Sequence, residues 1–423
     1  MSVPTTASLT TPAIDGGAKT RETPMPVRKL FGEAEKAAVS SLIDRAVAEG
    51  SHLLGYGGEQ ERAYCEAFCE SLGGGYADGV NSGTNALYVA LAALELEPLS
   101  EVIVPPITDP GGVMPVAMAG CVPVAADAAP ESGFNVTPEQ VERVITPRTR
   151  AVVVAHIAGI PVDMDGIRDL GYKHNLAIVE DCAQAHGATY KGQPCGTFGC
   201  VAAFSTMFGK HHASGGQGGL VYTRDAALFD RVRRHADRGK PFGIEPPPGN
   251  VACAINCNMD ELHAAIGRVN LAKLPAMVER RRAVARRIAE GVADLETVSM
   301  WQERNGDAAS YWFLTFALDI DKLGVDRDRF IEALLAEGLS VVAGYPFFPV
   351  RMPWMTDRCG VCRRGQACDL PGCAMRSSHD TTLPNATAFE ARSIRVIIHE
   401  GWSDRDADDL VTALAKLDTA YAR

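Results

Sequence analysis

Lys210 is the residue of this sequence with the clearest potential for covalent chemistry. It stands in a short segment between two apolar runs, Val201–Phe204 and Leu220–Tyr222, which have the length and composition of buried strands. Burial lowers the pKa of a lysine because it disfavours the charged form. A neutral amine adds to carbonyl compounds to form a Schiff base. An exposed lysine in a glycine-rich loop would give the same pattern, so the interpretation depends on the other parts of a site.

A second candidate is the turn Ser82-Gly83-Thr84, which lies between a short strand and a helix expected over Ala86–Leu94. Backbone N–H groups at a helix N-terminus, together with nearby hydroxyl groups, favour anions such as a phosphate. The alternative is a plain helix cap, which would account for Ser82 or Thr84 alone.

A third candidate is Asp181, which directly follows the expected strand Leu176–Glu180. A carboxylate at the end of such a strand could pair with the ring nitrogen of pyridoxal phosphate (PLP) and keep that nitrogen protonated, which makes the ring an electron sink. Gln184 could reach the ring hydroxyl. A helix-capping or solvent-facing acid is the simpler alternative for Asp181.

Apolar runs alternate with helical patterns through the middle of the chain. This alternation predicts an α/β fold with a mostly parallel sheet covered on both faces. In such sheets ligands bind at the carboxyl ends of the strands. The expected strands are Glu101–Val104, Cys121–Ala126, Ala151–Ala155, Leu176–Glu180, Val201–Phe204 and Gly219–Tyr222.

The sequence divides into three parts. Residues 1–25 are small and polar and predict a disordered tail, and residues 26–270 form the large domain. Residues 271–423 begin with a charged connecting helix, Pro275–Leu295, and continue as a smaller α+β domain.

Composition excludes several classes of protein. The formal net charge of −11 over 423 residues argues against a nucleic-acid-binding surface. No apolar run is long enough to cross a bilayer, and the N-terminus lacks the pattern of a secretory signal. We therefore expect a cytoplasmic enzyme or binding protein without nucleic-acid or membrane partners, whose cysteines are mostly reduced.

Four cysteines gather in the C-terminal part: Cys359, Cys362, Cys368 and Cys373. Four thiolates can bind zinc tetrahedrally, and a Cys-x-x-Cys start is typical of such sites. The later spacing is not that of a standard zinc ribbon. A disulfide or free thiols are the alternatives.

Four segments, in order, resemble the DegT/DnrJ/EryC1/StrS aminotransferases. They are the turn VNSGTNAL, the strand end EDCAQAHGA, the lysine segment with Ser205 five positions before Lys210, and the stretch Ile255–Gly267. The resemblance implies the aspartate aminotransferase fold, with a large PLP-binding domain, and activity on keto sugars and ketocyclitols. It also implies that Lys210 forms the Schiff base and moves the proton, that Asp181 pairs with the ring nitrogen, and that Gly83, Thr84 and Ser205 hold the phosphate.

The resemblance extends to residues outside this set. Asn256 matches the family asparagine that reaches the phosphate of a neighbouring subunit, which implies a homodimer with shared sites. His156 lies in a His-x-x-Gly stretch near the site, or is simply a core histidine. His211 and His212 could line the acceptor pocket or only fill the turn.

The sequence departs from the family pattern at two positions. Asp109 stands where the family usually places an aromatic ring on the cofactor, and a carboxylate cannot stack in that way. Asn258 replaces an arginine that contacts anions, which favours an uncharged ketocyclitol or simple keto sugar over a sugar nucleotide.

Amino transfer from glutamine or glutamate to a keto acceptor is the leading hypothesis. A PLP-dependent dehydratase, eliminase or oxidase is the alternative, and a non-catalytic binding protein on the same fold is the third.

Overall fold

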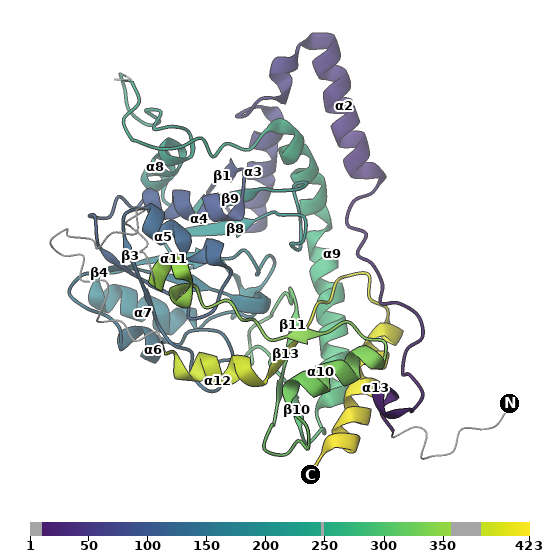
Figure 1. The fold of residues 1–423 in the computed structure, drawn as a ribbon. Coiled ribbons are helices and arrows are strands. Elements are labelled where there is room, and N and C mark those ends of the chain that lie inside the picture. Colours follow the sequence, from purple (N-terminus) through teal and green to yellow (C-terminus); the bar gives the residue numbers. More distant parts are fainter. Residues whose placement is uncertain (1–10, 247–248, 357–381) are drawn as a thin grey trace.

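The computed structural model describes residues 11–246, 249–356 and 382–423, and a seven-stranded sheet forms its centre (Figure 1). The strand order is β1-β9-β8-β5-β4-β2-β3, and only β9 runs antiparallel to its neighbours. The predicted mostly parallel sheet is therefore confirmed. The strands are β1 Tyr76–Val80, β2 Glu101–Val104, β3 Val122–Ala125, β4 Thr149–Ala155, β5 Ala177–Asp181, β8 Val201–Ser205 and β9 Gly219–Thr223.

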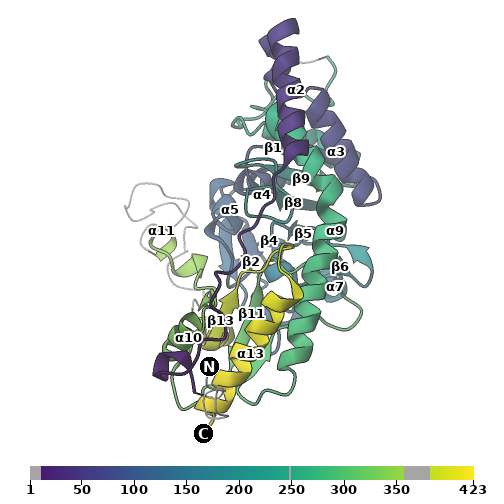
Figure 2. The same ribbon diagram turned by 90° about the vertical axis from the view of Figure 1, so that its right-hand side faces the viewer.

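Helices cover both faces of this sheet (Figures 1 and 2). Strand β4 shows how the sequence achieves this: Val153 joins the core beneath α4, whereas Val152 and Val154 join the core that includes α7. Successive strand residues point to opposite faces, so an apolar run is buried on both sides. The helices of this part are α3 Glu59–Ser71, α4 Gly83–Ala92, α5 Met114–Met118, α6 Pro138–Glu142, α7 Met164–His174 and α8 Ala226–Ala236; a hairpin joins β6 Thr189–Tyr190 to β7 Gln193–Pro194.

A second, antiparallel sheet lies in the C-terminal part of the chain. Its strand order is β10-β11-β13-β12, formed by Val298–Met300, Leu314–Leu318, Ser393–Val396 and Val342–Ala343 respectively. The associated helices are α10 Arg327–Ala336, α11 Pro353–Thr356, α12 Pro384–Arg392 and α13 Asp404–Tyr421. Among the described helices, none combines the length and apolar character needed to cross a membrane.

One long helix, α9, runs from Glu261 to Val292 beside both sheets (Figure 2). The prediction that a helix starts at Pro275 is wrong, because Pro275 lies inside α9. The helix starts at the Asp260 cap, whose side chain accepts the backbone N–H of His263 at 2.9 Å. The predicted division between residues 270 and 271 falls inside this helix, and the domain limits stay a prediction.

The segment that precedes α2 (Glu33–Glu49) packs against the C-terminal part. Arg21 is buried and pairs with Asp406 at 2.8 Å and with Asp409 at 2.7 Å, both in α13. The backbone N–H groups of Ala13 and Thr20 both donate to the carboxylate of Glu337, a buried residue at the end of α10. The prediction of a disordered tail is therefore wrong for residues 11–25, because a polar composition does not reveal ion pairs with distant partners.

Candidate active site

A cavity of about 160 Å³ lies at the carboxyl ends of the parallel strands. It brings together eight of the residues predicted from the sequence, which come from four separate segments of the chain. These are Ser82, Gly83, Thr84, Asp109, Asp181, Gln184, Ser205 and Lys210. The cavity is therefore the candidate active site.

Lys210 occupies the loop between β8 and β9, and only 6% of the residue is exposed. Burial lowers the pKa of its amine to about 8, although the carboxylates of Asp181 and Asp109 act in the opposite direction. The Nζ atom lies 3.6 Å from the centre of the Trp312 ring, a distance at which an aromatic face attracts an ammonium group. With a pKa of about 8, about a tenth of the amine is neutral at pH 7, and the neutral form is the one that adds to a carbonyl.

Asp181 is the last residue of β5 and lines the same cavity. Its Oδ1 atom accepts the backbone N–H of Ala183 at 3.0 Å, which fixes the orientation of the carboxylate. Burial raises the pKa of Asp181, while the hydrogen bond to Ala183 and the charge of Lys210 lower it. Its carboxylate offers the cavity a negative group of the kind that a protonated ring nitrogen would need.

Gln184 also lines the cavity, and hydrogen bonds hold its side chain in place. Its Oε1 atom accepts the backbone N–H of Ala158 at 2.9 Å, and its Nε2 atom donates to the Tyr345 hydroxyl at 3.3 Å. The side chain thus connects the cavity with a tyrosine from the C-terminal part of the chain.

The turn at the start of α4 forms a small polar cup. Ser82 caps this ten-residue helix by accepting the N–H of Asn85 at 3.1 Å, so the simple capping role considered for Ser82 is present. Gly83 approaches β8 so closely that a methyl group on it would lie 2.4 Å from the Cβ atom of Ser205. The helix N-terminus and the hydroxyls of Thr84 and Ser205 face one space, which suits a phosphate.

Asp109 lies at the rim of this cavity and is exposed. Its Oδ1 atom accepts the N–H of Gly111 at 2.9 Å and caps the 3₁₀ turn Pro110–Gly112. The residue therefore has a local structural role as well as a negative charge that acts on Lys210.

The backbone of Lys210 is held from the N-terminal segment. The guanidinium group of Arg28 donates to the carbonyl oxygens of Lys210 at 2.7 Å and His211 at 2.8 Å. Its Nε atom pairs with Glu400 at 2.8 Å, and Glu400 also pairs with the buried Arg281 at 3.0 Å. This network connects the two ends of the chain to the lysine loop.

The structure does not bring His211 and His212 to the cavity. Both are fully buried, and burial lowers the pKa of each ring well below its ordinary value. The Nε2 atom of His211 donates to the Ser310 carbonyl at 3.0 Å, and that of His212 lies 2.6 Å from the Tyr64 hydroxyl. The structure therefore contradicts the expectation that these two rings could line the acceptor pocket. Both rings belong to the buried core instead.

His156 is likewise buried and is not among the residues that line the cavity. Its Nδ1 atom accepts the N–H of Val162 at 3.0 Å, and its Nε2 atom lies 3.2 Å from Glu180. Cys182 completes a buried group whose potential ligand atoms lie within 4.8 Å of one another. Because backbone N–H groups already occupy both oxygens of Glu180, these contacts are those of a satisfied core histidine.

Asn256 lies outside the cavity and is exposed. Its Oδ1 atom accepts the backbone N–H of Asn258 at 3.1 Å, and its backbone pairs with Asp237. The residue therefore reaches no part of this chain's own cup.

The predicted metal ligands Cys359, Cys362, Cys368 and Cys373 lie outside the described residues, and the eight cysteines of the described ranges are free thiols.

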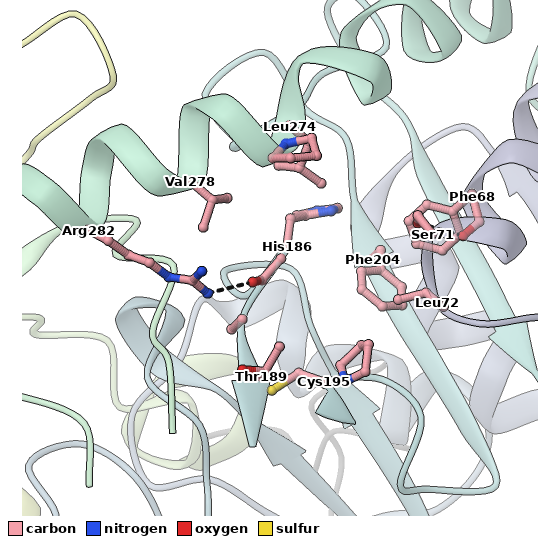
Figure 3. A pocket seen from close by; sticks show the side chains of 14 residues that line it. Phe68, Ser71, Leu72, His186, Thr189, Cys195, Phe204, Leu274, Val278 and Arg282 are labelled. Atoms are coloured by element: carbon pink, nitrogen blue, oxygen red, sulfur yellow. Dashed lines mark hydrogen bonds between the residues drawn. The ribbon is translucent and has the colours of Figure 1, made fainter. Parts of the chain in front are cut away.

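A second cavity, about 270 Å³ in volume, lies between α9, α3 and β8 (Figure 3). Its walls are mostly apolar, including Phe68, Phe204, Leu274 and Val278, and it also contains the ring of His186. Burial lowers the pKa of His186 to about 4, and its Nε2 atom donates to the Ser205 carbonyl at 2.7 Å. None of the predicted catalytic residues faces this cavity, so it is separate from the candidate site.

Sequence reasoning missed several residues that contact or line the site, among them Trp312, Arg28 and Gln217. Trp312 and Arg28 come from segments about one hundred and two hundred positions from Lys210, and no local pattern indicates their contact with it. Gln217 lines the cavity and stands inside the glycine-rich turn, so its position next to the lysine segment was a usable signal.

Comparisons with known proteins show which family the chain belongs to. Residues 43–414 match the DegT/DnrJ/EryC1/StrS aminotransferase family. The chain belongs to this family. It is 36% identical over 329 residues to the dTDP-3-amino-3,4,6-trideoxy-alpha-D-glucose transaminase of Streptomyces venezuelae, covering 78% of this chain and 83% of that protein. It is 32% identical over 348 residues to the L-glutamine:2-deoxy-scyllo-inosose aminotransferase of Micromonospora echinospora, covering 79% of this chain and 82% of that protein.

Solved structures show the same fold. The aminotransferase from Psychrobacter cryohalolentis superposes with a TM-score of 0.80 at 30% identity, covering 93% of this chain and 97% of that chain. Membership of the DegT/DnrJ/EryC1/StrS family supports PLP as the cofactor. The residues present fit this group, since one cavity combines a largely desolvated lysine, a carboxylate and a hydroxyl-lined helix N-terminus.

Proposed function

We propose that this enzyme transfers an amino group from glutamine or glutamate to a keto sugar or a ketocyclitol. One observation supports this most strongly: Lys210 and Asp181 share a cavity with the Gly83–Thr84 cup in a chain of an aminotransferase family. PLP supplies the electron sink when it is bound. The protein must then hold that group, supply an amine, and place and remove a proton.

Each of these tasks has a residue in the cavity. Lys210 supplies the amine, and because burial lowers its pKa to about 8 it can also accept and return a proton. Asp181 provides the negative charge that keeps a ring nitrogen protonated. Thr84 and Ser205 offer hydroxyl donors at the start of α4 to a phosphate, where the helix dipole also favours negative charge.

The acceptor is proposed to be an uncharged ketocyclitol or a simple keto sugar. Of the named relatives, one acts on a dTDP-sugar, which carries a diphosphate, and the other acts on 2-deoxy-scyllo-inosose, an uncharged ketocyclitol. Asn258 stands where the family usually carries an arginine, and an amide cannot neutralise a diphosphate as a guanidinium does. Secondary metabolism or amino-sugar biosynthesis is the setting that these relatives suggest.

A homodimer with shared sites is part of the same proposal. The exposed Asn256, with Ile255 beside it 47% exposed, is free to contact a second copy. Sedimentation of the purified protein tests the dimer. Mixing a Lys210→Ala chain with an Asn256→Ala chain tests the sharing: restored activity in the mixture supports it.

A zinc ion at the Cys359–Cys373 segment stays a hypothesis, which elemental analysis of the purified protein tests.

The function is tested with glutamine and 2-deoxy-scyllo-inosose as substrates. Native protein loaded with PLP should release 2-oxoglutaramate in step with an aminated cyclitol, and Lys210→Ala should release neither. An acceptor that loses water without gaining nitrogen would instead support the dehydratase alternative, for which the charge of Asp109 is the motivating feature. No product with any keto sugar or ketocyclitol, at full PLP content, would contradict the proposal.

A further inference from the structure

The second cavity, which lies between α9, α3 and β8, plays no part in the chemistry proposed above (Figure 3). Its volume is about 270 Å³, and an apolar cavity of about 150 Å³ is large enough to hold benzene. A compound built on one six-membered ring therefore fits. Ser71 and Pro275 line the cavity and are exposed, so a ligand can enter it from solvent.

The wall of this cavity favours a ligand without charge. No carboxylate stands among its lining residues, all of which the structure describes, so a cation finds no partner there. Among the same described residues, Arg282 carries the permanent charge, and it donates to the carbonyl oxygens of Gly187 at 2.9 Å and Ala309 at 2.8 Å. The guanidinium group is thus engaged with the backbone. The inner wall consists of buried apolar side chains: Phe68, Leu72, Phe204, Leu274 and Val278.

His186 adds one polar atom that lacks a partner, and Figure 3 shows its ring among the apolar side chains of the wall. The Nε2 atom donates to the Ser205 carbonyl at 2.7 Å, and the ring is neutral near pH 7 because burial lowers its pKa to about 4. A neutral imidazole has one N–H group, so Nδ1 is a hydrogen-bond acceptor. This Nδ1 atom is buried and accepts no hydrogen bond from the residues that the structure describes. A buried acceptor is unfavourable without a donor, which a ligand with an O–H group supplies.

The second cavity and the candidate active site lie on opposite faces of β8. Phe204 lines the second cavity, whereas the next residue, Ser205, lines the candidate active site, and successive strand residues point to opposite faces. A ligand beside Phe204 and His186 therefore leaves free the space that a phosphate and the substrates need.

We propose that the second cavity is a binding site for a small neutral phenol whose hydroxyl group donates to the Nδ1 atom of His186. The rings of Phe68 and Phe204 lie edge to face with their centres 4.9 Å apart, and such a wall packs well against a flat ring. The apolar body of a phenol matches the inner wall, and its O–H group matches the one acceptor that lacks a donor. The site is independent of the proposed function.

The test titrates 4-fluorophenol and 4-fluorotoluene, which differ by a hydroxyl and a methyl group of similar size, into PLP-loaded protein and follows both probes by fluorine NMR. Native protein should bind both in a saturable way. Val278→Phe adds a ring to the wall and should weaken both by about tenfold or more. Leu274→Trp fills the same space from the neighbouring turn of α9, which keeps the test valid if one variant fails to fold. Ala276→Phe is the matched control, at an exposed position of α9 outside the wall.

His186→Phe tests the hydrogen bond, because it keeps a flat ring and removes the Nδ1 acceptor. The ratio of 4-fluorophenol affinity to 4-fluorotoluene affinity should fall by about 2- to 10-fold, the range for one hydrogen bond between neutral groups. An unchanged ratio would overturn the role of His186. Equal binding of 4-fluorophenol by native protein and by folded Val278→Phe and Leu274→Trp would place the probe elsewhere and overturn the site. No saturable binding of either probe by native protein would overturn it as well.

Discussion

The contact between Lys210 and Trp312 predicts how the basicity of the Lys210 amine is set. The Nζ atom lies 3.6 Å from the ring centre, and the indole face stabilises the ammonium form but not the neutral amine. Removing the face should therefore lower the pKa of Lys210. Trp312→Leu keeps an apolar side chain at the position and removes the aromatic face.

The size of the effect follows from the strength of the contact. A cation–π interaction contributes about 0.5–2 kcal/mol, and 1.36 kcal/mol corresponds to one pKa unit, so Trp312→Leu should lower the pKa of Lys210 by about 0.4–1.5 units. Burial already lowers this pKa to about 8. The amine of the variant should consequently have a pKa of about 6.5–7.6 and a larger neutral fraction at physiological pH.

Competitive acetylation of PLP-free protein across a pH series measures this pKa directly, when the Lys210 peptide is quantified by mass spectrometry. Trp301→Leu is the matched control, because Trp301 packs on Phe134 rather than on the lysine. Trp312→Phe separates two causes, since it loses the hydrogen bond from Trp312 Nε1 to the Gly209 carbonyl but keeps a ring. An unchanged or raised pKa in Trp312→Leu would refute the reasoning. Equal shifts in the Leu and Phe variants would assign the effect to the hydrogen bond.

Three further predictions concern the same site. Gly83→Ala should lower the free energy of unfolding by about 1–3 kcal/mol, because the new methyl group would lie 2.4 Å from Ser205. In the control Gly216→Ala the methyl group would meet nothing within 4 Å, so the free energy of unfolding should not change. Chemical denaturation measures both values. The rate of PLP uptake by PLP-free protein should rise with pH through about 8 as Lys210 loses its proton. Asp109→Asn removes a charge that raises the pKa of Lys210, so this rise should move to lower pH; a shift to higher pH would contradict the account. Arg28→Met removes the guanidinium group that donates to two carbonyl oxygens of the lysine loop. The amide hydrogens of residues 206–218 should therefore exchange faster than in the control Arg45→Met, which changes an exposed arginine.

Local patterns in the sequence were sufficient for much of the site. The lysine between two buried strands, the glycine turn before α4 and the acid at the end of β5 each depend on neighbours within a few residues. The parallel sheet then brings these strand ends together, so Lys210, Asp181 and Gly83 meet in one cavity. The roles of these residues remain predictions that the experiments above test.

Other features depend on distant contacts and could not be predicted from the sequence. His211 and His212 follow the lysine directly, but sequence position does not show toward which side a loop residue projects, and both rings enter the core. Trp312 contacts Lys210 and Tyr345 contacts Gln184, and both come from the C-terminal part of the chain. The ordered segment before residue 25 depends on Arg21, whose partners lie almost four hundred positions away.

The central claim is that the Lys210 amine bonds covalently to a PLP aldehyde in the cavity that Asp181 lines. Borohydride reduction of PLP-loaded protein, followed by peptide mass spectrometry, tests it most directly. The account predicts a visible absorbance band that reduction abolishes and a single cofactor adduct on the Lys210 peptide. Cofactor on another lysine, or full PLP content with no adduct at position 210, would contradict it.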